Sequence, residues 1–182
     1  MRIVGGALRG RILRSVPGDG TRPTADRVRQ SLFDLLGQRM DGLAVLDLFA
    51  GTGALGLEAI SRGASSAVLV EKDARACGVI LGNIDDLKVS GQARVLRGDL
   101  PAALSQLRGQ RFELVFSDPP YALRAAQIIV DGLCSNDLLA PGARVVLEMD
   151  RREEKPLLPA ELSLADERRY GDTVVLVVAK GA

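Results

Sequence analysis

The sequence contains no histidine and no tryptophan, and only two of its 182 residues are cysteine. Without histidine the chain cannot use a His-based catalytic triad, a histidine general base or a histidine metal ligand. The two cysteines, Cys77 and Cys134, are far apart and form no Cys-x-x-Cys pair. This spacing argues against a structural zinc site. We therefore expect no metal, and we expect a reduced, cytoplasmic setting.

Long apolar runs are also missing. The longest are strand-sized, and the N-terminus lacks the apolar core of a signal peptide, so we expect neither secretion nor membrane insertion. Aromatic residues make up only 3%, whereas hydrophobic residues reach 47% and charged residues 26%. The core must then be built mainly from alanine, leucine and valine. The length fits one domain with a short appendage.

Acidic residues are scarce at the start of the chain. The first thirty residues hold seven arginines and two aspartates, a net charge of +5, whereas the whole chain has +1 and the remainder therefore −4. A basic arm on a mildly acidic body indicates either contact with a polyanion or a solvated tail. Because all seven cations are arginine, recognition of phosphates or bases is favoured over solubility alone.

The N-terminal region carries one glycine pair, Gly5-Gly6, and one helical pattern. Residues 1–16 alternate loosely around their glycines, which predicts a small hairpin that carries arginine side chains. Residues 17–23 predict a loop. Thr24 can cap a helix that runs to about Arg39.

Beyond residue 43, apolar runs alternate with helical patterns. Five strands separated by helices imply a parallel sheet with right-handed crossovers and helices on both faces. A turn signal at Tyr170-Gly171-Asp172 adds an antiparallel hairpin, so we predict an α/β fold with a seven-stranded, mostly parallel sheet. The predicted strands cover residues 44–49, 66–71, 93–98, 112–117, 143–149, 162–169 and 173–180. The predicted helices cover 54–62, 74–88, 101–108 and 123–134. We expect a turn at Pro141-Gly142.

A glycine-bearing turn follows the first of these strands. Asp47 precedes Gly51 and Gly53 at a strand-to-helix junction, where glycines let the backbone turn sharply and approach a ligand. With Gly56 the spacing also satisfies G-x-G-x-x-G, so a nicotinamide cofactor stays open. Asp47 favours S-adenosylmethionine instead, because its carboxylate would suit a cationic amino-acid group and sit awkwardly near a pyrophosphate.

Acidic residues stand at or near the ends of successive strands. Glu71 ends the second strand, where an acid can accept hydrogen bonds from two ribose hydroxyls of either cofactor. Asp99 follows the third strand and can accept a hydrogen bond from an adenine amino group or cap the next helix. Together with Asp47 and Asp118, these side chains are expected to converge on one edge of the sheet.

The most specific feature is Asp118-Pro119-Pro120-Tyr121, which closes the fourth strand. Two prolines remove two N–H donors and restrict the backbone, so the Asp118 carboxylate and nearby carbonyls form a rigid set of acceptors. Such acceptors suit the amino group of a nucleic-acid base, whose lone pair they can aim at an electrophilic methyl group. Tyr121 can stack on the base. The four residues are therefore the predicted catalytic site, and no metal is required.

The basic arm joins the first predicted helix through Arg22-Pro23-Thr24 and Arg27. A base must leave its stack to be methylated, and its backbone then needs to be held. Arginines of the arm can grip phosphates in a salt-dependent way. The predicted nucleic-acid contacts are Arg9, Arg11, Arg22, Thr24 and Arg27.

These features together resemble the RsmD family, bacterial 16S rRNA guanine-N2 methyltransferases. The resemblance covers essentially the whole chain, and the Arg-Pro-Thr segment and the arm are its most family-specific parts. The motifs that carry it are Gly5-Gly6, Arg9-Gly10-Arg11, Arg22-Pro23-Thr24-x-Asp26-Arg27-Val28-Arg29, Asp47-x-Phe49-Ala50-Gly51-x-Gly53-Ala54-Leu55-Gly56-x-Glu58-Ala59 and Asp118-Pro119-Pro120-Tyr121.

The resemblance implies a class I methyltransferase fold and S-adenosylmethionine as the cofactor. It also implies 16S rRNA in a partly assembled 30S subunit as the substrate. On this basis residues 1–24 form a basic arm and residues 25–182 a methyltransferase domain, which we expect to act as a monomer. The choice of guanine N2 among base amino groups rests on the resemblance alone.

Three alternatives remain open from the sequence. An adenine-N6 or cytosine-N4 DNA methyltransferase would use Asp118-Pro119-Pro120-Tyr121 equally well, although 182 residues leave little room for a sequence-reading domain. An NAD-dependent oxidoreductase would use the glycine turn. A non-enzymatic RNA-binding assembly factor would use only the basic arm.

Overall fold

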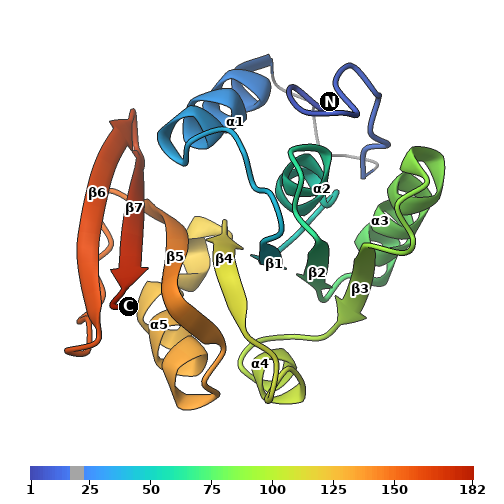
Figure 1. Cartoon of the computed structure of the whole chain (residues 1–182). Coiled ribbons are helices and arrows are strands. Elements are labelled where there is room, and N and C mark those ends of the chain that lie inside the picture. The colour runs from blue at the N-terminus through green and yellow to red at the C-terminus, as the bar shows by residue number, and fades with distance from the viewer. Residues whose placement is uncertain (17–22) are drawn as a thin grey trace. The chain divides into compact units, whose positions relative to one another are not determined.

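The computed structural model describes residues 1–16 and 23–182, with the side chains of residues 23–28 outside the description. The chain divides into two compact units, Met1–Arg97 and Gly98–Ala182. Figure 1 shows the order of helices and strands along the chain. The seven strands follow the order β3-β2-β1-β4-β5-β7-β6, with an antiparallel hairpin at the C-terminus. The predicted fold class is confirmed. The predicted boundary after residue 24 stays a prediction.

The first unit contains three parallel strands and three helices. The pairs β1–β2 and β2–β3 are both parallel, and β1 and β2 are mostly buried. Burial of successive residues means that both faces of these strands are covered. The elements are α1 (Pro23–Leu35), β1 (Ala44–Leu48), α2 (Ala54–Ser61), β2 (Ser66–Glu71), α3 (Ala74–Leu87) and β3 (Ala93–Arg97).

Local sequence explains how the helices of this unit begin and end. The Asp73 side chain accepts hydrogen bonds from the backbone N–H groups of Arg75 and Ala76, which caps α3. Gly63 adopts φ +107°, a left-handed conformation that ends α2. Lys88 caps the C-terminus of α3 in the left-handed region.

The first helix differs from its prediction at both ends. It begins at Pro23, so Thr24 lies inside the helix and is not its cap. Proline suits the first helical position because that residue needs no N–H partner within the helix. The helix ends at Leu35 rather than near Arg39, because Gly37 and Gln38 both adopt positive φ.

The arm forms the small hairpin that the sequence predicted. Arg2 and Ile12 make an isolated antiparallel bridge. The N–H of Ile3 donates to the Arg11 carbonyl at 2.9 Å, and the N–H of Leu13 donates to the Met1 carbonyl at 3.1 Å. Ile3 and Leu13 are buried, so the two sides of the hairpin are anchored by apolar side chains.

The second unit combines a parallel strand pair with the closing hairpin. Strands β4 and β5 are parallel, whereas β5–β7 and β6–β7 are antiparallel. In Figure 1, β6 and β7 run side by side at the C-terminal end of the chain. The elements are α4 (Ala102–Gln106), β4 (Phe112–Ser117), the short 3-10 helix η1 (Tyr121–Leu123), α5 (Ala126–Ser135), β5 (Leu139–Asp150), β6 (Leu162–Tyr170) and β7 (Thr173–Lys180).

The turn expected at Pro141-Gly142 was wrong. Strand β5 runs through both residues, and the β4–β5 register shifts between Phe112 and Leu114. Gly142 adopts φ +72° at this irregularity, a conformation that glycine allows without strain. Its N–H donates to the Gly181 carbonyl at 3.1 Å. A local bulge therefore replaces the turn.

The helices of the second unit are shorter than predicted. The pattern that predicted one helix over residues 123–134 is divided into η1 and α5, because Arg124 adopts φ +44° and breaks the helical path. The helix predicted over residues 101–108 covers only Ala102–Gln106. No helix in the described part of the chain is long and apolar enough to cross a membrane.

Candidate active site

The turn after β1 depends on glycine at two positions. Gly51 and Gly53 have φ +57° and +78°, and the Gly53 N–H donates to the Ala50 carbonyl at 2.7 Å. A Cβ on Gly53 would lie 2.9 Å from the Leu69 side chain, so packing also requires glycine there. A Cβ on Gly51 would meet only the Phe49 carbonyl, at 4.0 Å. Open space therefore lies beside the Gly51 backbone, as close approach of a ligand requires.

Asp47 lies beneath this turn. It is 2% exposed, and its carboxylate accepts a hydrogen bond from the Gly56 N–H at 2.9 Å. Gly56 is in the first turn of α2, so the negative charge sits at the positive end of the helix. Asp47 thus ties β1 to α2, a role that the sequence did not predict. Contact with a cofactor stays a prediction for this residue.

Glu71 connects the glycine turn to the loop after β2. One carboxylate oxygen accepts the Gly51 N–H at 2.9 Å, and the other accepts the N–H groups of Lys72 and Asp73, each at 2.8 Å. Each carboxylate oxygen has two lone pairs, so the oxygen bound to Gly51 keeps acceptor capacity. The structure therefore brings together Gly51 and Glu71, which the sequence assigned to one cofactor pocket.

Asp99 lies two residues beyond β3, in the second unit. Its carboxylate accepts the N–H of Leu100 at 3.0 Å, and its carbonyl accepts the N–H of Ala103 at 2.9 Å. Helix α4 has Pro101 as its N-cap, without a side-chain hydrogen bond. Asp99 is therefore not the side-chain cap of this helix. It is exposed, and its proposed contact with adenine remains a prediction.

The segment Asp118–Tyr121 follows β4 directly and leads into η1. Pro119 is buried, whereas Asp118, Pro120 and Tyr121 are exposed. The Pro120 carbonyl accepts the N–H of Leu123 at 2.9 Å, which closes the short helix. Asp118 is accessible, yet the protein atoms around its carboxyl group remove enough water to raise its pKa.

Tyr121 is held at the surface of the second unit. It is 41% exposed, and its hydroxyl is hydrogen-bonded to the hydroxyl of Thr173 on β7. Beside it lies a cavity of about 280 Å³. The residues that line this cavity are Tyr121, Ala122, Arg124, Asp150, Arg152 and Glu153. An exposed aromatic ring beside a cavity is suited to stacking on a base.

Glu148 is a residue of this region that sequence reasoning missed. It is half-buried in β5 and directly follows Leu147, the register partner of Ser117, which is the last residue before Asp118. Burial, and after it the negative charge of Asp118, raise the pKa of Glu148 to about 8. In the sequence, the only sign of a special role for Glu148 was its position as an acid within the apolar predicted strand 143–149.

The structure describes only part of the predicted nucleic-acid contacts. Arg9 is exposed and lines a cavity of about 670 Å³ on the first unit. The Arg11 side chain donates to the Asp86 carbonyl on α3. Arg22 lies outside the described residues. For Thr24 and Arg27 only the backbone, in α1, is described.

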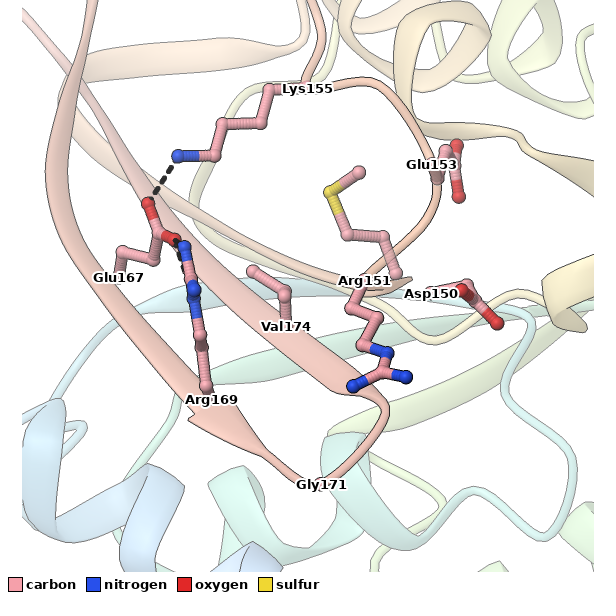
Figure 2. Close-up of a pocket in the computed structure, with 9 residues that line it drawn as sticks. Asp150, Arg151, Glu153, Lys155, Glu167, Arg169, Gly171 and Val174 are labelled. Atoms are coloured by element: carbon pink, nitrogen blue, oxygen red, sulfur yellow. Dashed lines mark hydrogen bonds and ion pairs between the residues drawn. The ribbon is translucent and has the colours of Figure 1, made fainter.

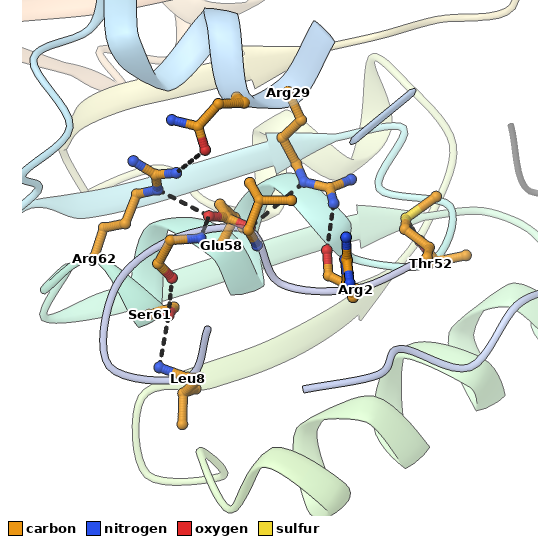
Figure 3. A network of polar contacts seen from close by, with 12 residues as sticks. Arg2, Leu8, Arg29, Thr52, Glu58, Ser61 and Arg62 are labelled. Carbon is orange, nitrogen blue, oxygen red and sulfur yellow. Dashed lines mark hydrogen bonds and ion pairs between the residues drawn. The ribbon is translucent and has the colours of Figure 1, made fainter. Parts of the chain in front are cut away.

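A buried carboxylate anchors the arm, and sequence reasoning gave it no role. Glu58 on α2 is fully buried and accepts the N–H groups of Val4 at 2.8 Å and Gly5 at 2.7 Å. It also pairs with the buried side chains of Arg62 at 2.9 Å and Arg29 at 3.5 Å. Figure 3 shows Arg29 and Arg62 reaching Glu58 from different elements. In the sequence, the only sign of this role was the position of Glu58 as a charged residue in an otherwise apolar helix.

Ser61 makes the second attachment of the arm. Its hydroxyl accepts the Leu8 N–H at 2.9 Å and donates to the Gly5 carbonyl at 2.6 Å, as Figure 3 shows in part. Its carbonyl accepts the Ala7 N–H at 2.7 Å. A Cβ on Gly6 would lie 1.8 Å from that carbonyl oxygen, so the backbone contact requires glycine.

Another cavity, of about 230 Å³, lies on the second unit and is shown in Figure 2. Lys155 and Arg169 both point to the Glu167 carboxylate, while Arg151 pairs with Asp172 at 3.0 Å. These three cations are already paired with acids, so the cavity is poorly suited to an anionic ligand. Among the described residues no group of three or more His, Cys, Asp or Glu side chains is placed to hold a metal ion.

Comparison with known proteins identifies the family. The family model described as "Conserved hypothetical protein 95" matches residues 1–179. The chain belongs to this family. It is 35% identical over 182 residues to "Putative rRNA methyltransferase YlbH" of Bacillus subtilis, and the match covers 99% of each chain. It is 39% identical over 171 residues to "Ribosomal RNA small subunit methyltransferase D" of Escherichia coli, covering 94% of this chain and 85% of the relative.

A solved structure agrees with these relatives. The structure described as "Putative methyltransferase yhhF from Escherichia coli" superimposes with a TM-score of 0.88 at 36% identity, covering 100% of this chain and 98% of the other. The resemblance to the RsmD family that the motifs indicated is therefore confirmed, and it extends over the whole chain.

Proposed function

We propose that the protein transfers a methyl group from S-adenosylmethionine to the exocyclic N2 amino group of a guanine in 16S rRNA. The observation that carries this proposal is the Asp118–Tyr121 segment at the end of β4, with an exposed tyrosine ring beside a cavity. Relatives that span nearly the whole chain and are named rRNA methyltransferases support the reaction and the class of substrate.

The cofactor half of the proposal rests on the first unit. The open space beside Gly51 fits a ligand that approaches the backbone closely. Glu71 is held at that turn by its bond to the Gly51 N–H, where its carboxylate can accept the ribose hydroxyls. In this assignment Asp47 acts mainly by fixing the turn and α2, and Asp99 accepts a hydrogen bond from the adenine amino group.

The chemistry needs little from the protein beyond position and electrostatics. When bound, S-adenosylmethionine supplies an electrophilic methyl group, whose carbon–sulfur bond breaks as the nitrogen–carbon bond forms and leaves its electron pair on sulfur. The Asp118 carboxylate and the Pro119 carbonyl accept hydrogen bonds from the base NH2 group and favour a pyramidal nitrogen. Tyr121 stacks on the base. The alkylated nitrogen then loses one proton to Asp118 or to water.

The arm is assigned to the rRNA. Its hairpin is anchored on α2 by Glu58 and Ser61, which leaves Arg9 exposed for phosphate contact. We propose that Arg9, Arg11, Arg22, Thr24 and Arg27 hold the substrate backbone. We further propose that the substrate is a partly assembled 30S subunit in the cytoplasm, that the protein acts on it as a monomer, and that no metal takes part.

Incubation of the purified protein with labelled S-adenosylmethionine tests the proposal. Separate reactions should contain 30S particles, free 16S rRNA or double-stranded DNA, followed by digestion to nucleosides. We expect label in N2-methylguanosine from 30S particles. Label in N6-methyladenine or N4-methylcytosine from DNA would replace the proposal with a DNA methyltransferase. Tight binding of NAD without any response to S-adenosylmethionine would replace it with an oxidoreductase.

The Asp118→Ala variant separates catalysis from binding. If the protein were only an RNA-binding assembly factor, this change would alter nothing measurable. We expect transfer to be abolished while rRNA affinity is kept.

A further inference from the structure

Glu148 and Asp118 are neighbours across two parallel strands. The register of β4 and β5 pairs Ser117 with Leu147. Asp118 follows the last residue of β4, and Glu148 follows Leu147 within β5. Neighbouring strands lie about 4.8 Å apart, and residues at the same register project from the same face of a sheet. The backbone positions of Asp118 and Glu148 are therefore adjacent, and their carboxyl groups project from the same face of the sheet at the C-terminal end of β4.

Strand β7 places Tyr121 on this same face. Glu148 pairs with Val175, and Asp150, two residues further, pairs with Thr173. Side chains two residues apart in a strand share a face, so Thr173 lies on the face of Glu148. The Thr173 hydroxyl is hydrogen-bonded to the Tyr121 hydroxyl. Asp118 therefore lies next to Glu148, and the Tyr121 hydroxyl reaches the same face of the sheet two residues further along, at Thr173.

The described surroundings offer Glu148 no cation as a partner. On β7 its neighbours Val175 and Thr173 are uncharged. On β6 the register partner of Val175 is Arg168, whose guanidinium pairs with Asp166 at 3.0 Å.

Two further groups on β5 share this face. Asp150 is paired with Arg152 at 2.9 Å, and Arg144 lies four residues before Glu148. Strand rise places Arg144 about 13 Å away along the strand. On α5 the buried side chains are apolar, and the exposed Asp131 accepts a hydrogen bond from Gln127. Asp118 is thus the ionisable group that acts on Glu148 in the described structure.

We infer that Glu148 is a positioning residue, whose carboxyl group keeps a proton at neutral pH and donates it in a hydrogen bond to the Asp118 carboxylate. The inference rests on the proposed function, because it assigns Asp118 the role of acceptor for the base amino group. The pair then carries one negative charge. One Asp118 oxygen is fixed by Glu148, and the other is aimed at the substrate.

Electrostatics supports a shared proton. Two adjacent carboxylates that lack a cation cannot both ionise without strong repulsion, so one stays protonated well above its usual range. The pKa of Glu148 is raised to about 8, by burial first and by Asp118 second, and burial raises the pKa of Asp118 as well. Above about pH 8 the second proton is lost, and repulsion separates the two carboxylates.

Single-turnover methyl transfer to 30S particles, measured from about pH 6 to about pH 9.5, tests the inference with Glu148→Gln and Glu148→Ala. The control is Glu113→Gln, an acid earlier on β4. For the wild type we expect a fall in rate above about pH 8, and Glu148→Gln should lose this fall while its rate at pH 7 stays within about fivefold. In steady-state assays, Glu148→Ala should lower kcat by about tenfold or more with little change in KM. Glu113→Gln should behave as the wild type.

A measurement independent of the substrate separates this inference from the proposed function. Carboxyl ¹³C NMR of the labelled protein should show one group that titrates near pH 8 in the wild type and in Glu113→Gln. That group should be missing in Glu148→Gln. An unchanged alkaline titration or an unchanged alkaline fall in Glu148→Gln would overturn the inference, whatever base is methylated. A clear titration without N2-methylguanosine formation would support the pair and refute only the proposed function.

Discussion

The hydroxyl group of Tyr121 is hydrogen-bonded to the hydroxyl group of Thr173, 52 residues later in the chain. Tyr121 is the last residue of the Asp118–Tyr121 segment and the first residue of the short helix η1. Thr173 is the first residue of the last strand, β7. The closing hairpin therefore does more than add an edge to the sheet. It restrains the one aromatic ring of the proposed base-binding site, which reduces the motion that the ring would lose on stacking.

Replacing Tyr121 should separate stacking from restraint. Tyr121→Ala removes the ring, and a stacking contact of about 1–3 kcal/mol corresponds to a loss of roughly 5- to 150-fold in methyl transfer. Tyr121→Phe keeps the ring and removes only the bond to Thr173, so we expect a loss of about tenfold at most. Single-turnover rates on 30S particles measure both. Tyr170→Phe, at the exposed end of β6, is the control, and a wild-type rate in Tyr121→Ala would contradict the assignment.

Glu71→Gln should weaken cofactor binding selectively. The amide keeps the size of the side chain but loses the charge that holds the N–H groups of Gly51, Lys72 and Asp73. Hydrogen bonds to charged groups contribute about 1.5–3 kcal/mol, so we expect the Kd for S-adenosylmethionine to rise by roughly ten- to a hundredfold. Titration calorimetry measures this change. The exposed Glu154→Gln is the control, and equal Kd values for the two variants would exclude the assignment of Glu71.

Gly6→Ala should detach the arm from α2. The new Cβ would overlap the Ser61 carbonyl oxygen at 1.8 Å, and φ +75° adds backbone strain. Gly10→Ala is a matched control, because Gly10 has φ +86° but nothing within 4 Å. We expect Gly10→Ala to cost about 1 kcal/mol of unfolding free energy and Gly6→Ala at least about 2 kcal/mol. Urea unfolding compares them, and equal losses would show that the contact with Ser61 is not needed.

Arg9→Gln should reduce the salt dependence of rRNA binding. Each phosphate contact contributes roughly one to the slope of log K against log salt concentration. Arg9 is exposed on the arm, so we expect the slope to fall by about one. Arg111→Gln is the control, because Arg111 lies in the second unit and pairs with Asp137. Filter binding at several salt concentrations gives both slopes, and identical slopes for Arg9→Gln and the wild type would place Arg9 outside the interface.

The sequence alone determined the order of elements and much of the candidate site. The strands Ser66–Glu71 and Phe112–Ser117 have the predicted bounds, because short apolar runs between charged or glycine-containing segments are a local signal. The glycine turn and Asp118–Tyr121 were equally visible, since turn chemistry depends on residues that are adjacent in the chain.

Only the tertiary structure decided which groups surround these motifs. Glu58 anchors Val4 and Gly5 from more than fifty residues away, and burial in β5 together with the charge of Asp118 raises the pKa of Glu148. Burial and pairing of this kind depend on contacts between distant segments. No local pattern carries them, because the same glutamate in the same helix or strand would be solvated if the partner segment were absent.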